Sequence, residues 1–201
     1  ILGDAAQNVN PYSSTTADDI RKALYKAEIM KLNKSYRSGY EITELAKSIS
    51  GNSEIDVVER HTEKPQLIEV SSREAESQLM REMIMEVDVN NPTSTAYIFK
   101  LEKDAIAFFE SLGELQKRAT LLVSGCQAFT NGIVVTTSHM AKGLEFDEVV
   151  IPNVTKANYN DEMDKSLLYI ACTRAMHRLK MIFCEEHTEF INNALCISKK
   201  K

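Results

Sequence analysis

The stretch Val134-Val135-Thr136-Thr137-Ser138-His139-Met140-Ala141-Lys142-Gly143-Leu144-Glu145-Phe146-Asp147-Glu148-Val149-Val150-Ile151 decides the fold that this sequence predicts. Two runs rich in β-branched residues flank a polar loop that carries Thr, His, Lys, Gly and Glu. We therefore expect two buried strands, over 132–137 and 146–152, joined by one compact loop. In open α/β sheets such loops lie at the carboxyl ends of strands, where ligands bind, so we expect a ligand site here.

Outward from this stretch, strand patterns alternate with helical patterns along the chain. This alternation is typical of parallel βαβ units, and it predicts an α/β fold with a doubly wound, mostly parallel sheet and helices on both faces. We expect one domain over 1–201, a fragment of a longer protein, with a small strand pair at about 55–70. The expected helices cover 16–27, 40–50, 75–87, 103–112, 161–177 and 186–195, and the other expected strands cover 1–2, 29–32, 55–59, 66–70, 95–99, 120–124 and 178–184.

The composition limits the classes of function. The net charge of −5 over 201 residues argues against a free-standing basic nucleic-acid-binding protein, so any nucleic-acid contact must be local or shared. The four cysteines form no Cys-x-x-Cys pair, and no signal peptide or long apolar span is visible. We expect free thiols and a reducing, cytoplasmic location without membrane contact. The four histidines form no His-x-x-x-His pattern, so we expect no metal site.

Two arginines stand out. The segment 167–176 is apolar nearly all round and predicts a buried helix, with Arg174 on the same face as Leu167 and Ile170. A buried guanidinium needs an anionic partner. That partner is either a core carboxylate or a phosphate in a cleft, to which the planar fork is suited. Arg37 lies in a polar turn, where a lone arginine is usually a solvated surface group.

The polar loop itself allows a functional and a structural interpretation. Gly143 would permit close approach of the backbone to a ligand, and Glu145 would accept hydrogen bonds from a sugar hydroxyl. Glu145 is equally suited to cap a loop or a helix. His139 fits a structural histidine, and Lys142 fits a solvated lysine.

Four motifs in order give the sequence a family resemblance. Thr137-Ser138-His139-Met140-Ala141-Lys142-Gly143-Leu144-Glu145-Phe146 resembles the fifth conserved motif of superfamily-one helicases of the UvrD/Rep type. Leu168-Tyr169-Ile170-Ala171-Cys172-Thr173-Arg174-Ala175 resembles their sixth, Gly3-Asp4-Ala5-Ala6-Gln7 their third, and Asn33-Lys34-Ser35-Tyr36-Arg37-Ser38 their fourth. Within the family, three segments resemble the HelD, or helicase-IV-like, branch. They are Lys34-Ser35-Tyr36-Arg37-Ser38, Glu59-Arg60-His61-Thr62-Glu63-Lys64-Pro65 and Cys172-Thr173-Arg174-Ala175-Met176-His177.

The resemblance implies the second RecA-like domain of an ATP-dependent DNA helicase or translocase, in which ATP and Mg²⁺ lie between two such domains. It implies that Arg174 is the arginine finger and that Arg37 is a second contact to the γ-phosphate. Gln7 would sense the γ-phosphate or position the attacking water. The resemblance further implies that Tyr36 stacks on the adenine and that Glu145, next to Gly143, binds the ribose.

On the opposite side of the loop, the resemblance implies that Thr137 and His139 contact single-stranded DNA. The implied partners are this DNA and an N-terminal RecA-like domain of the same polypeptide. If the likeness to HelD holds, RNA polymerase is a further partner. The alternative function is then an interaction module of an RNA-polymerase-associated ATPase with little or no unwinding activity.

Some features of the family are missing from the sequence. No Trp occurs, so base stacking by the third motif is not expected, and no Gly-x-x-x-x-Gly-Lys-Ser/Thr occurs, so the chain has no phosphate-binding P-loop. The pair Asp147-Glu148 begins a strand and is not expected to bind Mg²⁺. We therefore predict that the isolated chain neither hydrolyses ATP nor unwinds duplex DNA. A free-standing dinucleotide-binding domain is disfavoured because Gly-x-Gly-x-x-Gly is missing.

Overall fold

A parallel sheet forms the centre of the computed structural model, which describes residues 22–23, 34–35, 37–51, 56–57, 59–88, 93–125, 132–191 and 197–199. Within these ranges seven strands join in one sheet, and all of its strand pairings are parallel. In spatial order the strands are β5 (Ala119–Leu122), β6 (Ile133–Thr137), β4 (Thr95–Phe99), β7 (Phe146–Ile151), β8 (Ala175–Phe183), β3 (Gln66–Glu69) and β9 (Ile197–Lys199).

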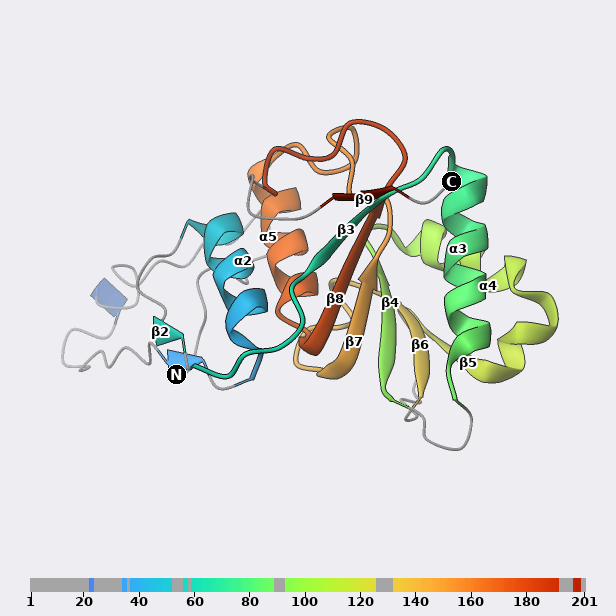
Figure 1. The fold of residues 1–201 in the computed structure, drawn as a ribbon, viewed down its shortest axis with the longest axis horizontal. Coiled ribbons are helices and arrows are strands. Elements are labelled where there is room, and N and C mark those ends of the chain that lie inside the picture. The colour runs from blue at the N-terminus through green and yellow to red at the C-terminus, as the bar shows by residue number, and fades with distance from the viewer. Residues whose placement is uncertain are drawn as a thin grey trace.

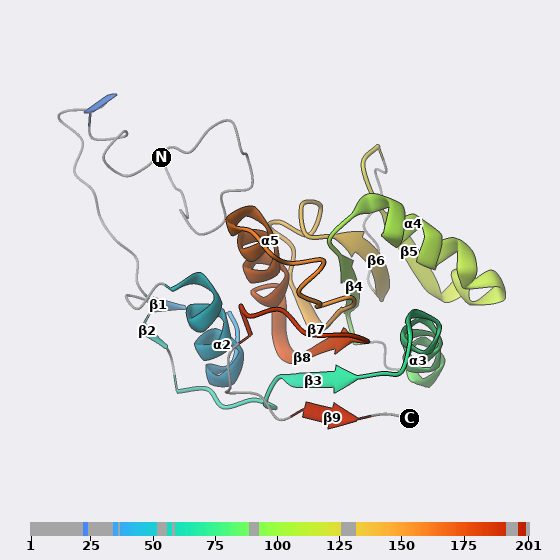
Figure 2. The same ribbon diagram turned by 90° about the horizontal axis from the view of Figure 1, so that it is seen from above.

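Helices cover both faces of this sheet (Figure 1). Helices α2 (Tyr40–Ser50) and α5 (Glu162–Cys172) pack on one face, and α3 (Arg73–Glu86) and α4 (Glu102–Ser111) pack on the other. The same arrangement is visible from above in Figure 2, where β9 lies outside β3 at one edge. Each face has its own hydrophobic core. The structure thus confirms the predicted doubly wound α/β fold.

The central strands are buried because helices cover them from both sides. Every residue of β4 and of β6 is buried, which matches the near-continuous apolar runs expected of parallel strands. A 3-10 helix, η2 (Gly113–Arg118), leads into the edge strand β5. Among the helices of the described ranges, none combines the length and the apolar character needed to cross a membrane.

Local signals set the ends of the helices. Gly51 ends α2 in the left-handed conformation, with φ 71°, and its N–H donates to the Lys47 carbonyl at 2.9 Å. Ser72 caps α3 by accepting from the Ala75 N–H, and Asp161 caps α5 by accepting from the Asp164 N–H. The bounds of α2 and β4 are those that the sequence predicts.

The predicted strand pair at 55–70 is wrong. Strand β2 (Asp56–Val57) pairs with β1 (Lys34–Ser35) in a separate two-stranded sheet, while β3 joins the large sheet between β8 and β9. Both Leu67 and Ile68 of β3 are buried, so this strand needs cover on both faces. A short apolar run predicts a strand but does not specify its partner, and this ambiguity caused the error.

Two predicted helices also differ from the structure. Helix α5 ends at Cys172, and the chain enters β8 at Ala175, because Ala175 already pairs with Phe146 of β7. Periodicity alone does not divide one continuous apolar run into a helix and a strand. The final helix predicted over 186–195 is not found over 186–191, where His187 forms an isolated antiparallel bridge with Thr155. Residues 192–195, and the elements predicted at 1–2 and 29–32, lie outside the described residues.

Candidate functional site

The loop 138–145 runs from the carboxyl end of β6 to the amino end of β7. It leaves β6 at Thr137, and it enters β7, which is parallel to β6 with β4 between them. On β4, Thr137 is level with Phe99, whereas Glu148 of β7 is level with Thr95. Four residues of strand correspond to about 13 Å along the sheet. The expectation of a loop confined to the carboxyl ends is therefore wrong, because this loop delivers Glu145 to the amino end of β7.

The loop is a chain of hydrogen-bonded turns that packs on the α2 and α5 face. The Ala141 N–H donates to the Thr137 carbonyl at 2.9 Å, and the Leu144 N–H donates to the Ala141 carbonyl at 3.0 Å. Ala141 is fully buried in the core of this face. Gly143 has φ 90°, and among the described residues, apart from Gly143 and its two chain neighbours, no atom lies within 4 Å of the place where its Cβ would be. The backbone conformation, rather than a close protein contact, therefore requires glycine here.

At its far end the loop meets the turn that carries Arg37. The Arg37 Nε donates to Glu145 Oε1 at 2.5 Å, although the two residues are 108 positions apart in the sequence. Their side chains remain 38% and 45% exposed. The Ser38 hydroxyl donates to the Ala175 carbonyl at 2.6 Å, which ties the same turn to the start of β8. Residues from three distant segments thus share one corner at the amino ends of β7 and β8.

Arg174 lies beneath this corner and is 1% exposed. It follows the end of α5, but its Nε still reaches back to the Ile170 carbonyl at 3.1 Å. Its Nη1 donates to the Leu144 carbonyl at 3.2 Å, and its Nη2 donates to the Thr173 hydroxyl at 3.1 Å. The Arg174 carbonyl also accepts from the Phe146 N–H at 2.9 Å. Arg174 therefore fixes both the end of the loop and the start of β7.

The predicted site residues divide between the carboxyl ends and the amino ends of the parallel strands. Thr137 is 3% exposed, and its hydroxyl accepts a long hydrogen bond, 3.4 Å, from the Met140 N–H. His139 is exposed at the same, carboxyl edge. Thr137 and His139 thus lie at the carboxyl ends of the strands. Arg37, Glu145 and Arg174 lie at the amino ends, one strand length away. Gln7 and Tyr36 lie outside the described residues.

The acidic pair at the start of β7 is used within the sheet. Asp147 Oδ2 accepts from the Ser94 N–H at 2.9 Å and from its hydroxyl at 2.7 Å, and these hydrogen bonds lower the Asp147 pKa. Glu148 pairs with Arg178 at 3.0 Å and with Lys180 at 2.6 Å. In the part of the chain that the structure describes, no group of three or more His, Cys, Asp or Glu side chains is placed to hold a metal ion.

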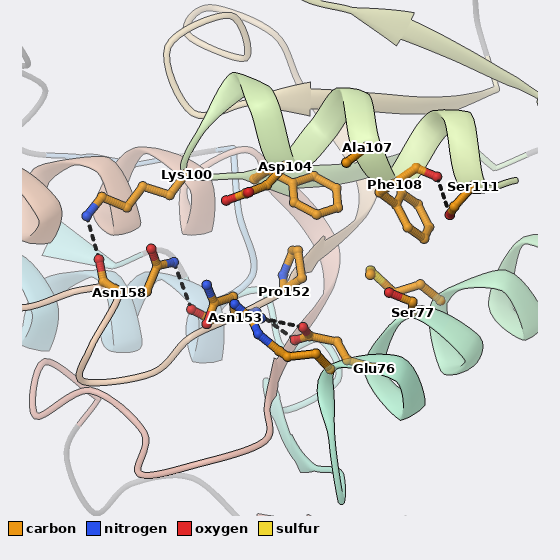
Figure 3. Close-up of a pocket in the computed structure, with 13 residues that line it drawn as sticks. Glu76, Ser77, Lys100, Asp104, Ala107, Phe108, Ser111, Pro152, Asn153 and Asn158 are labelled. Atoms are coloured by element: carbon orange, nitrogen blue, oxygen red, sulfur yellow. Dashed lines mark hydrogen bonds and ion pairs between the residues drawn. The ribbon is translucent and has the colours of Figure 1, made fainter.

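The opposite face contains a cavity of about 240 Å³ between α3 and α4 (Figure 3). None of the predicted site residues lines it. At its base, Glu76 is 3% exposed, pairs with Arg73 at 2.6 Å and accepts from the Asn153 N–H at 2.7 Å. Burial raises the Glu76 pKa. At the other end Lys100 pairs with the buried Asp164.

Sequence reasoning missed this cluster, although one signal was present. Glu76 lies on the apolar face of α3, one turn before Met80, where a charge needs a partner. Both buried carboxylates are paired within the domain, Glu76 with Arg73 and Asp164 with Lys100. We therefore interpret the cluster as part of the scaffold that joins α3, α5 and the ends of β4 and β7.

Comparison with known proteins confirms the resemblance to UvrD-like helicases. Residues 132–182 match the model of the UvrD-like helicase C-terminal domain. The structure of the C-terminal domain of a possible DNA helicase from Lactobacillus plantarum is 29% identical to this chain, with a TM-score of 0.66. The match covers 83% of this chain and 99% of that domain. The likeness to the HelD branch stays a prediction.

Other solved structures are similar at a lower level. An Arterivirus nonstructural protein 10 helicase in complex with DNA is 9% identical over 78% of this chain and 37% of that chain, with a TM-score of 0.48. The C-terminal domain of the DEAD-box protein Dbp5 is 10% identical over 68% of this chain and 88% of that domain, with a TM-score of 0.46. At this level neither match says anything about function. No curated protein matches the chain significantly.

Proposed function

We propose that this chain is the second RecA-like motor domain of an ATP-dependent DNA helicase or translocase, because residues 132–182 match the model of the UvrD-like helicase C-terminal domain. The observation that carries the proposal is the corner at the amino ends of β7 and β8. There Arg37 and Glu145 are paired and half-exposed, and the Leu144 carbonyl is held by Arg174. An exposed arginine beside a carboxylate, on a rigid base, suits a nucleotide's phosphates and ribose.

In this function the corner completes an ATP site whose P-loop and Mg²⁺ ligands belong to an N-terminal RecA-like domain. Arg37 binds the γ-phosphate, Glu145 the ribose, and Arg174 stabilises the charge on the transferring phosphoryl group. Because Arg174 is buried beneath the corner, closure of the two domains must bring the nucleotide to it. At the other edge, Thr137 and His139 contact single-stranded DNA.

The loop 138–145 then joins the two ligands mechanically. Its first residues lie at the carboxyl end of β6, where we propose that DNA binds. Its last residue lies at the amino end of β7, where we propose that ATP binds, and hydrogen-bonded turns connect the two ends. A displacement at one edge is transmitted because the loop is packed into the core through Ala141.

The proposal is tested by ATPase assays on the complete enzyme with and without single-stranded DNA. We expect Arg174→Ala to lower kcat by about 10³-fold and Arg37→Ala to raise the KM for ATP about tenfold. Arg118→Ala is the control, because this arginine binds the Met85 and Val87 carbonyls far from the corner. An unchanged kcat in Arg174→Ala together with an unchanged KM in Arg37→Ala would contradict the proposal. We also expect the isolated chain to show no ATP turnover.

A further inference from the structure

The turn 37–39, which presents Arg37, is held from two sides. On the first side lies the start of β8. The Ser38 hydroxyl donates to the Ala175 carbonyl at 2.6 Å, and the Gly39 N–H donates to the Met176 carbonyl at 3.2 Å. These bonds fix the turn against the strand that follows Arg174. These two hydrogen bonds do not involve the outer side of the turn or the first turn of α2, which contact a different segment.

On the second side lies the segment Arg60-His61-Thr62, which we name the clasp. The Arg60 carbonyl accepts from the Tyr40 N–H at 2.8 Å. The Thr62 N–H donates to Glu41 Oε2 at 2.9 Å, and His61 Nδ1 lies 2.8 Å from Glu41 Oε1. The clasp therefore supplies hydrogen-bond partners to the first turn of α2, whose N-cap residue, glycine, has no side chain to do so.

The contact between the clasp and the turn leaves no space for a side chain at Gly39. A Cβ on Gly39 would lie 1.9 Å from Thr62 Oγ1 and 2.6 Å from Thr62 Cβ. The backbone of Gly39 has φ −61° and ψ 162°, which any residue adopts. Glycine is therefore required at this position by the closeness of Thr62 alone.

The clasp also reaches β8 directly. Arg60 Nη2 lies 3.2 Å from His177 Nδ1, and His177 follows Met176, which binds Gly39. Clasp, turn and strand thus form a closed ring of contacts around Ser38 and Gly39. Arg60 and His61 are themselves exposed, so the clasp contributes little to the hydrophobic core. Its contacts go instead to the turn that carries Arg37.

We propose that the clasp is a positioning element for the nucleotide contact of Arg37. This proposal rests on the proposed function, in which Arg37 binds the γ-phosphate. By filling the space beside Gly39, Thr62 sets the direction in which the turn projects Arg37 towards Glu145. A displaced clasp leaves the sheet and both cores intact but turns the guanidinium away from the position that ATP requires.

The test uses the complete enzyme and four variants: Gly39→Ala, Thr62→Gly, the double variant and Gly51→Ala. The KM for ATP, kcat, affinity for single-stranded DNA and melting temperature are measured for each. A contact made equally to bound ATP and to the transition state changes KM alone, so we expect Gly39→Ala to raise KM about tenfold with kcat within about twofold. In the double variant the clash is removed, and we expect KM to return to within about threefold of the wild type.

Gly51→Ala is the matched control at the other end of the same helix. Gly51 has φ 71°, and apart from Gly51 and its chain neighbours no atom of the described residues lies within 4 Å of its Cβ position, so alanine strains α2 without touching the clasp. It should lower the melting temperature and leave KM unchanged. Equal KM values in Gly39→Ala and Gly51→Ala, or no recovery in the double variant, would overturn the clasp proposal. If Arg37→Ala itself leaves KM unchanged, the γ-phosphate contact that the proposed function gives to Arg37 is wrong, and the clasp proposal falls with it.

Discussion

The corner at the amino ends of β7 and β8 and the cavity between α3 and α4 both contain arginine–glutamate pairs, but the pairs differ in kind. Arg37 and Glu145 are distant in sequence and both half-exposed. Arg73 and Glu76 lie three positions apart on α3. Glu76 is buried and accepts a hydrogen bond from the Asn153 backbone N–H. An exposed pair exchanges its partner for a ligand easily, whereas a buried pair does not. Exposure and sequence separation therefore distinguish a candidate site from a structural ion pair.

Arg174 breaks this division, because it belongs to the corner and yet is buried. Its guanidinium makes hydrogen bonds to Ile170, Thr173 and Leu144, at about 1 kcal/mol each. We expect Arg174→Ala to lower the free energy of unfolding by about 3 kcal/mol, measured by urea denaturation followed by far-UV circular dichroism. Arg81→Ala, which removes one surface bond to the Ser111 carbonyl, is the control. A loss below about 1 kcal/mol for Arg174→Ala would show that the guanidinium does not hold the loop.

The two regions should respond to pH with opposite sign. Near the corner, hydrogen bonds from Thr62 and His61 lower the Glu41 pKa to about 2. The contribution of Glu41 to the stability of the fold is therefore present above pH 4.5 and is lost as the pH falls towards 2. Beside the cavity, burial raises the Glu76 pKa. The stabilising contribution of Glu76 is fully present below pH 4.5 and is lost as the pH rises through the pKa that Glu76 has in the folded state.

Urea unfolding of the wild type, Glu41→Gln and Glu76→Gln across this range measures both effects. We expect the stability advantage of the wild type over Glu41→Gln to shrink by about 1 kcal/mol on acidification, after allowance for solvent screening of this partly exposed group. On the same acidification, the free energy of unfolding of the wild type should rise relative to that of Glu76→Gln. The same sign for both pairs would contradict the assignment of Glu41 to the surface and Glu76 to the scaffold.

The smallest effect is expected for the pair that looks strongest. Arg37 and Glu145 are 2.5 Å apart, but both are exposed. We expect Arg37→Ala to change the free energy of unfolding by no more than about 0.5 kcal/mol. The same urea titration checks this, with Lys117→Ala, from the exposed pair with Glu114, as a second surface example. A loss near that of Arg174→Ala would mean that the pair supports the fold rather than a ligand.

The sequence predicts those parts of the fold that local patterns encode. The buried runs of β4 and β6 and the bounds of α2 follow from apolar periodicity and from Gly51. The partners of β2 and β3 do not, because pairing depends on which strand supplies the missing cover. The path of the loop across the sheet depends on β4 lying between β6 and β7, which no local pattern contains.

The candidate site shows the same limit. The motif order selected Arg37, Glu145 and Arg174, and the structure gathers these residues at one edge. Burial of Arg174 follows from its apolar neighbours, but its hydrogen bonds to Leu144 and Thr173 depend on where the loop ends. In the sequence the clasp appeared only as part of the run that resembles the HelD branch, because the contact between Gly39 and Thr62 exists only after folding.

The loop 138–145 occupies the place where a parallel crossover usually has a helix. Because its own residues Met140, Ala141 and Leu144 fill the core of that face, it is both connector and filling. This limits how the domain can be engineered. A label, tag or protease site inserted between Ser138 and Glu145 would open the core and disconnect the two edges together. Surface elements such as η2 are the better places for such insertions.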